Sequence, residues 1–172
     1  GRLTDQKNQI FLIKGFNKIL KDYPDLHLVI LGEGELDKQL KNLAKKLNIY
    51  ENIIFAGFEA NVFKYFNKAE FFILTSKWED PGFVLVEAAF SRVPIISSDC
   101  QNGPKEILND GAAGYLYKSA NFDSFLNNFK KAKNETRQNL KIKRLNALKI
   151  SKQYTTFRHF LSLQKVLQSI IK

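Results

Sequence analysis

Residues 75–107, TSKWEDPGFVLVEAAFSRVPIISSDCQNGPKEI, decide the fold of this chain. The apolar run FFIL at residues 71–74 precedes them and predicts a buried parallel strand. A polar loop follows at residues 76–81, then a helix at residues 82–90 and a second buried strand, PIISS, at residues 94–98. A strand, loop, helix and strand in this order form a βαβ unit, which requires a right-handed crossover. The stretch therefore predicts an α/β protein.

Two carboxylates flank the start of this predicted helix. Glu79 lies in the loop at the carboxyl end of the first strand, and Glu87 lies on the second turn of the helix. Gly82 stands between them, where a bare helix N-terminus exposes backbone N–H groups that attract anions such as phosphate. Glu79 could equally be a loop charge that the helix dipole favours, and Glu87 a solvated helix residue. From the residues alone, a ligand role and a structural role both remain open.

The rest of the chain repeats the alternation of strands and helices. Apolar runs at residues 26–31 (LHLVIL) and 52–56 (NIIFA) predict two further parallel strands, and residues 115–117 predict a short edge strand. Apolar residues at helical spacing predict helices before, between and after these strands, including a last one at residues 155–171. We therefore expect a Rossmann-like parallel sheet with flanking helices, which binds its ligand at the carboxyl ends of the strands.

Composition limits the classes of function. A length of 172 residues suits one domain. A net charge of +10 favours anionic binding partners such as nucleotide phosphates, acidic lipid surfaces or nucleic acid. The single Cys100 excludes an internal disulfide and fits a reducing cytoplasm; with only His27 and His159 beside it, no zinc site is expected. No apolar run reaches 18 residues and no signal-peptide pattern is present, so we expect neither a membrane span nor export.

The motif WEDPGFVLVEAA, followed by DCQNGPKEI, resembles the family-4 retaining glycosyltransferases, whose E-x7-E pattern corresponds to Glu79 and Glu87. It is similar to the subgroup that transfers hexoses or N-acetylhexosamines in bacterial glycan assembly. The resemblance implies the C-terminal, donor-binding half of a two-domain GT-B fold, and it covers nearly the whole chain. Residues 1–172 would form a single nucleotide-sugar-binding domain, cut from a longer protein whose N-terminal acceptor domain is absent. A helix within residues 153–172 would pack toward that missing domain.

The resemblance also assigns roles to residues. Arg2 and Lys7, in the opening GRL…KN, correspond to the cations that hold the donor diphosphate, and Glu79 corresponds to the carboxylate that orients the transferred sugar. The implied donor-binding set comprises Gly32, Gly57, Gly82, Phe83, Val84 and Glu87, with Glu87 on the ribose. No metal and no other cofactor is expected. One position departs from the family: Arg92 stands where a glycine is usual.

The sequence thus predicts transfer of a hexosyl or N-acetylhexosaminyl group from a nucleotide sugar to a glycan or lipid-linked acceptor. The transfer is expected to retain the anomeric configuration, and the donor is expected to be UDP-linked. A sugar-nucleotide epimerase-like domain and a non-catalytic nucleotide-binding module are the alternatives. The basic stretch at residues 130–152 carries nine cations and the single acid Glu135. It fits a solvated helix face, or a patch that meets an anionic membrane at its cytoplasmic face. Without nucleic-acid motifs or interleaved aromatics, nucleic acid is not an expected partner.

Overall fold

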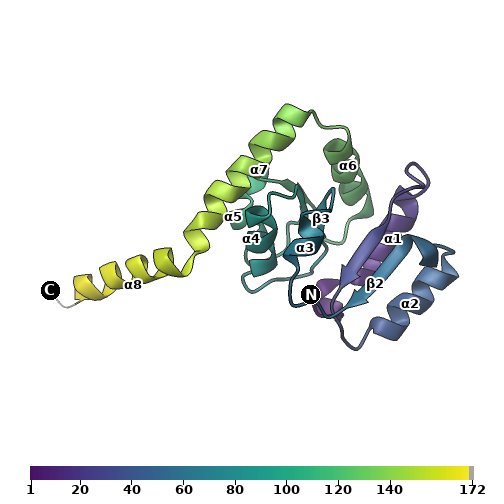
Figure 1. Ribbon diagram of the computed structural model, residues 1–172, viewed down its shortest axis with the longest axis horizontal. Coiled ribbons are helices and arrows are strands. Elements are labelled where there is room, and N and C mark those ends of the chain that lie inside the picture. Colours follow the sequence, from purple (N-terminus) through teal and green to yellow (C-terminus); the bar gives the residue numbers. More distant parts are fainter. Residues whose placement is uncertain (171–172) are drawn as a thin grey trace.

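The computed structural model describes residues 1–170, and it shows parallel strands covered by helices (Figure 1). The strands are β1 (Leu28–Leu31), β2 (Ile53–Gly57), β3 (Phe72–Leu74), β4 (Ile95–Ser98) and β5 (Tyr115–Tyr117). The α-helices are α1 (Gln9–Ile19), α2 (Asp37–Lys46), α3 (Phe63–Phe66), α4 (Phe83–Phe90), α5 (Pro104–Ile107), α6 (Phe122–Lys133), α7 (Arg137–Ser151) and α8 (Thr156–Ile170). The predicted α/β class is confirmed. The predicted end of the last helix, Ile171, lies outside the described residues.

All five predicted strands form, and every pairing is parallel. β1 pairs with β2 in one sheet, and β3, β4 and β5 pair in that order in a second, which places β5 at an edge as predicted. The parallel strands are divided between two sheets, because within the described residues β1 and β3 exchange no ladder hydrogen bonds. Alternation of strands and helices identifies parallel strands, but it does not say which strands are neighbours.

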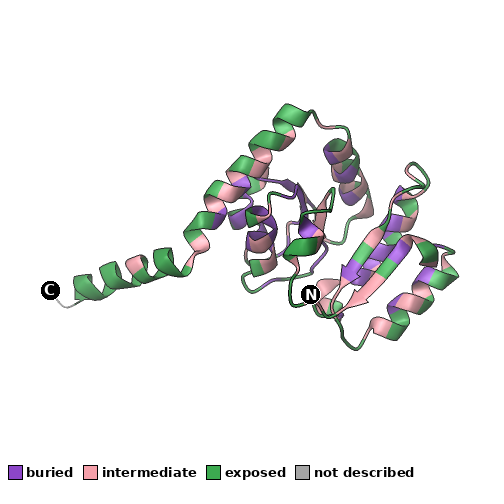
Figure 2. Ribbon diagram, viewed as in Figure 1, coloured by how far each residue is buried: buried purple, intermediate pink, exposed green. Residues whose placement is uncertain are grey.

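Three apolar clusters lie between the sheets and the helices. One packs β1 and β2 against α1 and α2, and includes Ile13, Ile30 and Leu40. The three-stranded sheet is covered on both sides: α4 and α7 lie against one cluster, and α1 and α6 against the other. Figure 2 shows buried residues concentrated in these layers. Coverage of both faces explains why the strands of this sheet are mostly apolar, as expected for a buried parallel sheet.

The first seven residues join the carboxyl ends of the two sheets. The Gly1 ammonium donates to the Leu31 carbonyl at the end of β1 (2.7 Å). After β3, the Thr75 hydroxyl donates to the Lys7 carbonyl (2.9 Å) and the Lys77 N–H donates to the Gln6 carbonyl (2.8 Å). The N-terminal segment therefore lies across the edge at which a parallel α/β fold places its ligand.

Candidate functional site

The loop after β3 brings a buried carboxylate to this edge. Glu79 is only 3% exposed, and both of its oxygens accept hydrogen bonds from the Lys7 ammonium (2.7 and 2.8 Å). The hydroxyl of Ser76, which is fully buried, donates to one of the same oxygens. A buried carboxylate is stable only when it is paired and hydrogen-bonded, and Glu79 meets both conditions. Lys7 and Glu79, which the family resemblance assigns to different parts of the donor, are 72 positions apart in the sequence and in direct contact in the structure.

The Glu79 loop is held between two other segments by backbone hydrogen bonds. On one side, the Gln6 side-chain amide donates to the Trp78 carbonyl (3.1 Å). On the other side, the Glu79 N–H donates to the Gln101 carbonyl (3.1 Å), and Trp78 forms a parallel bridge with Gln101. The loop therefore continues the sheet pattern beyond β3, which fixes the position of the Glu79 backbone.

The start of α4 lies beside this carboxylate. Gly82 precedes the helix with φ +85°, in the left-handed region, and no side chain caps the first turn. A Cβ at Gly82 would lie 3.3 Å from the Cβ and Cγ of Glu79, so a larger residue would press on the carboxylate. The first N–H groups of a helix have no intrahelical partner, and those of Phe83 and Val84 belong to this turn. These N–H groups can receive an anion, as the sequence predicts.

Glu87 is half-buried on the second turn of α4. Gly1 lies close to Lys7, because a Cβ at Gly1 would lie 3.8 Å from the Lys7 Cε. Because α4 begins beside Glu79, Glu87 on its second turn lies at the same end of this helix as the Glu79–Lys7 pair.

Gly32 and Gly57 lie at the carboxyl ends of β1 and β2, and the Gly32 N–H donates to the Gly57 carbonyl (2.6 Å). Their φ values of +125° and +70° belong to the left-handed region. A Cβ at Gly32 would lie 1.9 Å from the Gly1 carbonyl oxygen. Both predicted glycines therefore lie at the expected edge, and at Gly32 the fold itself requires glycine.

Arg2 is exposed, and its carbonyl accepts a hydrogen bond from the side chain of the buried Gln9 (2.9 Å). Sequence reasoning missed three supporting residues. Gln6 and Gln9 donate hydrogen bonds to backbone carbonyls of the site, and Ser76 donates to the carboxylate of Glu79. Ser76 could have been found, because a hydroxyl three residues before a buried loop carboxylate is well placed to donate to it. Gln6 and Gln9 carry no comparable local signal.

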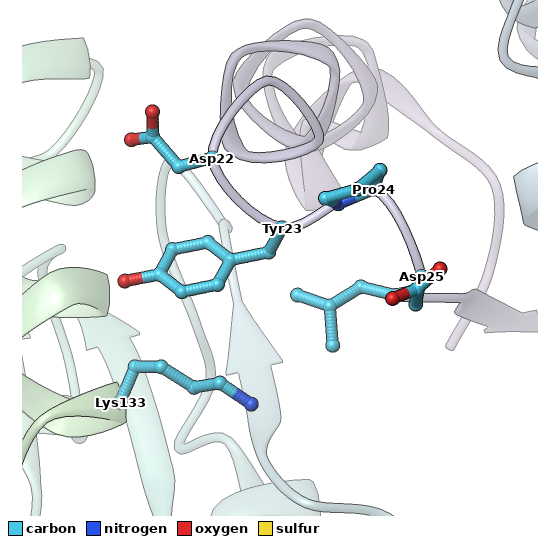
Figure 3. Close-up of a pocket in the computed structure, with 6 residues that line it drawn as sticks. Asp22, Tyr23, Pro24, Asp25 and Lys133 are labelled. Atoms are coloured by element: carbon cyan, nitrogen blue, oxygen red, sulfur yellow. The ribbon is translucent and has the colours of Figure 1, made fainter.

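Figure 3 shows a cleft of about 260 Å³ elsewhere, lined by Asp22, Tyr23, Pro24, Asp25, Leu26 and Lys133. It lies before the amino end of β1, whereas Glu79 follows the carboxyl end of β3. Its one cation is engaged, because Lys133 pairs with Glu70 (2.8 Å), and Asp22 pairs with Lys130 (2.8 Å). The cleft therefore lacks the free cations that a diphosphate would need, and we do not assign it to the donor.

Across the described residues, no cluster of three or more His, Cys, Asp or Glu side chains could hold a metal ion. In residues 1–170, no helix combines the length and the apolar character needed to cross a bilayer.

Comparison with known proteins places this geometry in a family. A profile described as "Glycosyl transferases group 1" matches residues 1–147. The chain is 43% identical over 108 residues to an uncharacterized glycosyltransferase of Methanocaldococcus jannaschii, covering 63% of this chain and 27% of that protein. It is 35% identical over 130 residues to the N-acetylgalactosamine-N,N'-diacetylbacillosaminyl-diphospho-undecaprenol 4-alpha-N-acetylgalactosaminyltransferase of Campylobacter jejuni, covering 76% and 35%.

Among solved structures, the pneumococcal O-GlcNAc transferase GtfA in complex with UDP and GlcNAc matches with a TM-score of 0.84 and 23% identity. The match covers 99% of this chain and 34% of that one. At this identity the likeness shows the fold alone. The chain spans about a third or less of the length of the two relatives that we compare.

Proposed function

The chain belongs to the group 1 glycosyl transferases, and from that premise we propose that it binds the nucleotide-sugar donor of a retaining hexosyl or N-acetylhexosaminyl transfer. One observation carries the proposal: the Lys7–Glu79 pair lies beside the uncapped start of α4, at the carboxyl edge of the sheet. This edge is where a doubly wound fold binds nucleotides. A UDP-linked donor is the specific form that we propose, supported by the bound UDP in the similar GtfA structure.

Leaving-group stabilisation is the chemistry that these residues offer. Departure of a nucleoside diphosphate concentrates negative charge on its phosphates, which cations and fixed N–H groups stabilise. Lys7 uses two of its three N–H donors on Glu79, so one donor stays available for a phosphate oxygen. In our proposal Arg2, Lys7 and the N–H groups of Phe83 and Val84 take the diphosphate. No metal ion is needed for this role, so donor binding should survive a chelator.

The two carboxylates take the hydroxyl groups of the donor. We assign the ribose to Glu87 and the transferred sugar to Glu79, each as a hydrogen-bond acceptor. Retention is supported by the α-linkage in the name of the Campylobacter relative, because an α-configured donor yields an α-product only when its configuration is kept. That name also contains a diphospho-undecaprenol, which supports a glycan or lipid-linked acceptor here. The acceptor would be bound by another part of the whole protein.

Calorimetry with uridine, UDP and a UDP-sugar tests the division of roles. Arg2→Ala and Lys7→Ala should each weaken UDP about tenfold or more, the loss of a charge-assisted hydrogen bond, and leave uridine nearly unchanged. Glu87→Ala should weaken uridine and UDP alike, because both contain the ribose. Glu79→Ala should spare both and weaken only the UDP-sugar.

The matched control is Lys14→Ala, which removes an exposed cation from α1 and should not change the affinity for UDP. Thermal melts of each variant show whether the fold is intact, which matters most for Glu79 because its carboxylate is buried. Equal losses for all three ligands at Arg2 or Lys7 would contradict the phosphate assignment. Absence of any UDP binding by the unmodified chain would contradict the proposed function itself.

A further inference from the structure

Trp78, the single tryptophan of the chain, is 46% exposed in the loop that carries Glu79. In the core beside this sheet, by contrast, Phe11, Tyr117 and Phe125 are buried and pack against one another in stacked, edge-on and tilted contacts. A half-exposed indole beside a buried carboxylate at the ligand-binding edge has no role in the fold described above. A ligand role explains its position.

The Trp78 indole is exposed although the backbone of its loop is well held by hydrogen bonds. The Trp78 carbonyl accepts the Gln6 amide, and the residue bridges to Gln101 on its other side. The neighbouring N–H groups are also engaged, Lys77 with the Gln6 carbonyl and Glu79 with the Gln101 carbonyl. The backbone under the indole is therefore fixed before any ligand arrives, which lowers the ordering cost of a contact with the ring.

Glu79 is buried against Lys7 and Ser76, whereas the preceding Trp78 is 46% exposed, so the indole is open to a ligand while the carboxylate is held inside the loop. The loop of Trp78 and the loop that bridges to it also carry exposed polar residues: Asp80 in the first, and Gln101 and Asn102 in the second. An exposed flat apolar ring on loops that also carry carboxylate and amide groups suits a pyranose, which has an apolar C–H face and a rim of hydroxyl groups.

We propose that the Trp78 indole stacks against a pyranose ring and selects for a sugar at this site. The proposal rests on the proposed function, which it extends to a specific residue. The ring could come from the transferred sugar of the donor or from a sugar of the acceptor. Both present the same C–H face, so the experiment separates them.

Because Trp78 is the only tryptophan, its fluorescence reports directly on the ring. The emission of the unmodified chain is recorded, with excitation at the red edge of the indole band, against three sets of ligands. They are UDP alone, the UDP-linked forms of glucose, galactose, N-acetylglucosamine and N-acetylgalactosamine, and the methyl α-glycosides of these sugars with UDP present. N-acetyltryptophanamide corrects for absorption by the nucleotide.

A blue shift with a UDP-sugar that UDP alone does not give supports stacking on the donor sugar. A shift that appears only with a methyl glycoside in the presence of UDP supports stacking on the acceptor. An unchanged emission with every sugar, while calorimetry detects UDP binding, overturns the inference and leaves the proposed function intact. A shift that UDP alone produces in full also overturns it, because the ring then contacts the nucleotide.

Two substitutions separate stacking from simple apolar packing. Trp78→Phe keeps a flat ring and should stay within about twofold of the original affinity for the sugar ligand, whereas Trp78→Leu should lose about threefold to tenfold. Neither should change the affinity for UDP. The control is Phe90→Leu, which replaces a 39% exposed ring at the far end of α4 and should change neither affinity. A loss with phenylalanine as large as that with leucine, or an equal loss for UDP, overturns the proposal.

Discussion

Arg92 shows how one residue carries strain at the end of α4. The Val93 N–H donates to the Ala88 carbonyl (3.3 Å) and the Arg92 N–H donates to the Ala89 carbonyl (3.0 Å). This pair of bonds is a Schellman motif, and it places Arg92 in the left-handed region with φ +57°. A residue with a Cβ is strained there by about 1–2 kcal/mol, and glycine is not. The family's usual glycine at this position thus has a backbone explanation.

Replacing Arg92 with glycine should stabilise the protein. Relief of about 1–2 kcal/mol of strain is partly offset by about 0.4–1 kcal/mol, because glycine makes the unfolded chain more flexible. We expect a net gain of about 0.5–1 kcal/mol in the free energy of unfolding, measured by urea denaturation. Arg92→Ala is the control, since it removes the guanidinium and keeps the Cβ. A gain with alanine equal to that with glycine would show that charge, not backbone strain, is what matters.

Among single residues, only part of the candidate site could be predicted from the sequence. The spacing of Glu79, Gly82 and Glu87 predicts a carboxylate, a bare helix start and a second carboxylate at one edge; in the structure Glu79 lies beside the uncapped start of α4, and Glu87 is on the second turn of that helix. The contact between Lys7 and Glu79 was not predicted: the family resemblance assigned both residues to the donor site in separate roles, and 72 residues separate them. The supports from Gln6 and Gln9 could not be predicted, because their partners are backbone carbonyls that only the folded chain brings near.

At the scale of elements, two loops form one unit at the carboxyl edge of the three-stranded sheet. The loop that ends β3 and the loop that ends β4 touch where Gly103, with φ +113°, faces Pro81. A Cβ at Gly103 would lie 1.9 Å from the Pro81 carbonyl oxygen. Because this contact lies two residues from Glu79, the second loop helps to position the carboxylate.

Gly103→Ala should therefore cost more stability than Gly111→Ala. Both glycines have positive φ, so each substitution introduces about 1–2 kcal/mol of backbone strain. The new Cβ at position 103 would also collide with the Pro81 carbonyl, which should cost about 1–3 kcal/mol more, whereas a Cβ at position 111 meets nothing within 4 Å. Urea denaturation with unchanged m-values measures the difference. Equal losses at the two positions would mean that the loops move apart freely.

Elements were predicted better than their assembly. The predicted strands differ from the observed ones by one or two residues at their ends, as expected where hydrogen bonding decides the boundary. The long helical region after residue 122 is divided at Thr136, whose side chain accepts the Asn139 N–H and begins α7. The division into two sheets was not predicted, because an apolar run indicates burial but does not identify its hydrogen-bonded neighbour.

At the scale of the whole molecule, several cations of the basic stretch at residues 130–152 are engaged in contacts within the fold. Lys130 and Lys133 pair with Asp22 and Glu70, and Lys143 donates to the carbonyls of Gly111 and Gly114. Burial is the main cause that lowers the pKa of Lys143. The cations left exposed in this stretch include Lys131, Arg137, Lys141, Lys149 and Lys152. Contact with an anionic membrane stays a prediction, and it depends on this smaller set.

Helix α8 extends away from the rest of the chain, as Figure 1 shows, and it has no buried residue. Its large apolar side chains are exposed, among them Phe157 (68%), Phe160 (58%) and Ile170 (73%). An apolar face of this kind on an extended helix indicates an interaction surface. That it packs toward another domain of the whole protein is still the prediction from the family resemblance.

Removing α8 should therefore leave the core intact. We expect a chain that ends at Tyr154 to melt within about 2 °C of the full chain, since about 1 kcal/mol of core stability would correspond to 2–4 °C at this size. Sedimentation should show the full chain associating at high concentration and the shortened chain remaining monomeric. As a control of unchanged length, Phe160→Ser combined with Leu167→Ser should also abolish association, because both side chains are at least half-exposed. A clear fall in melting temperature on shortening would instead mean that α8 stabilises the domain whose sheet carries Glu79.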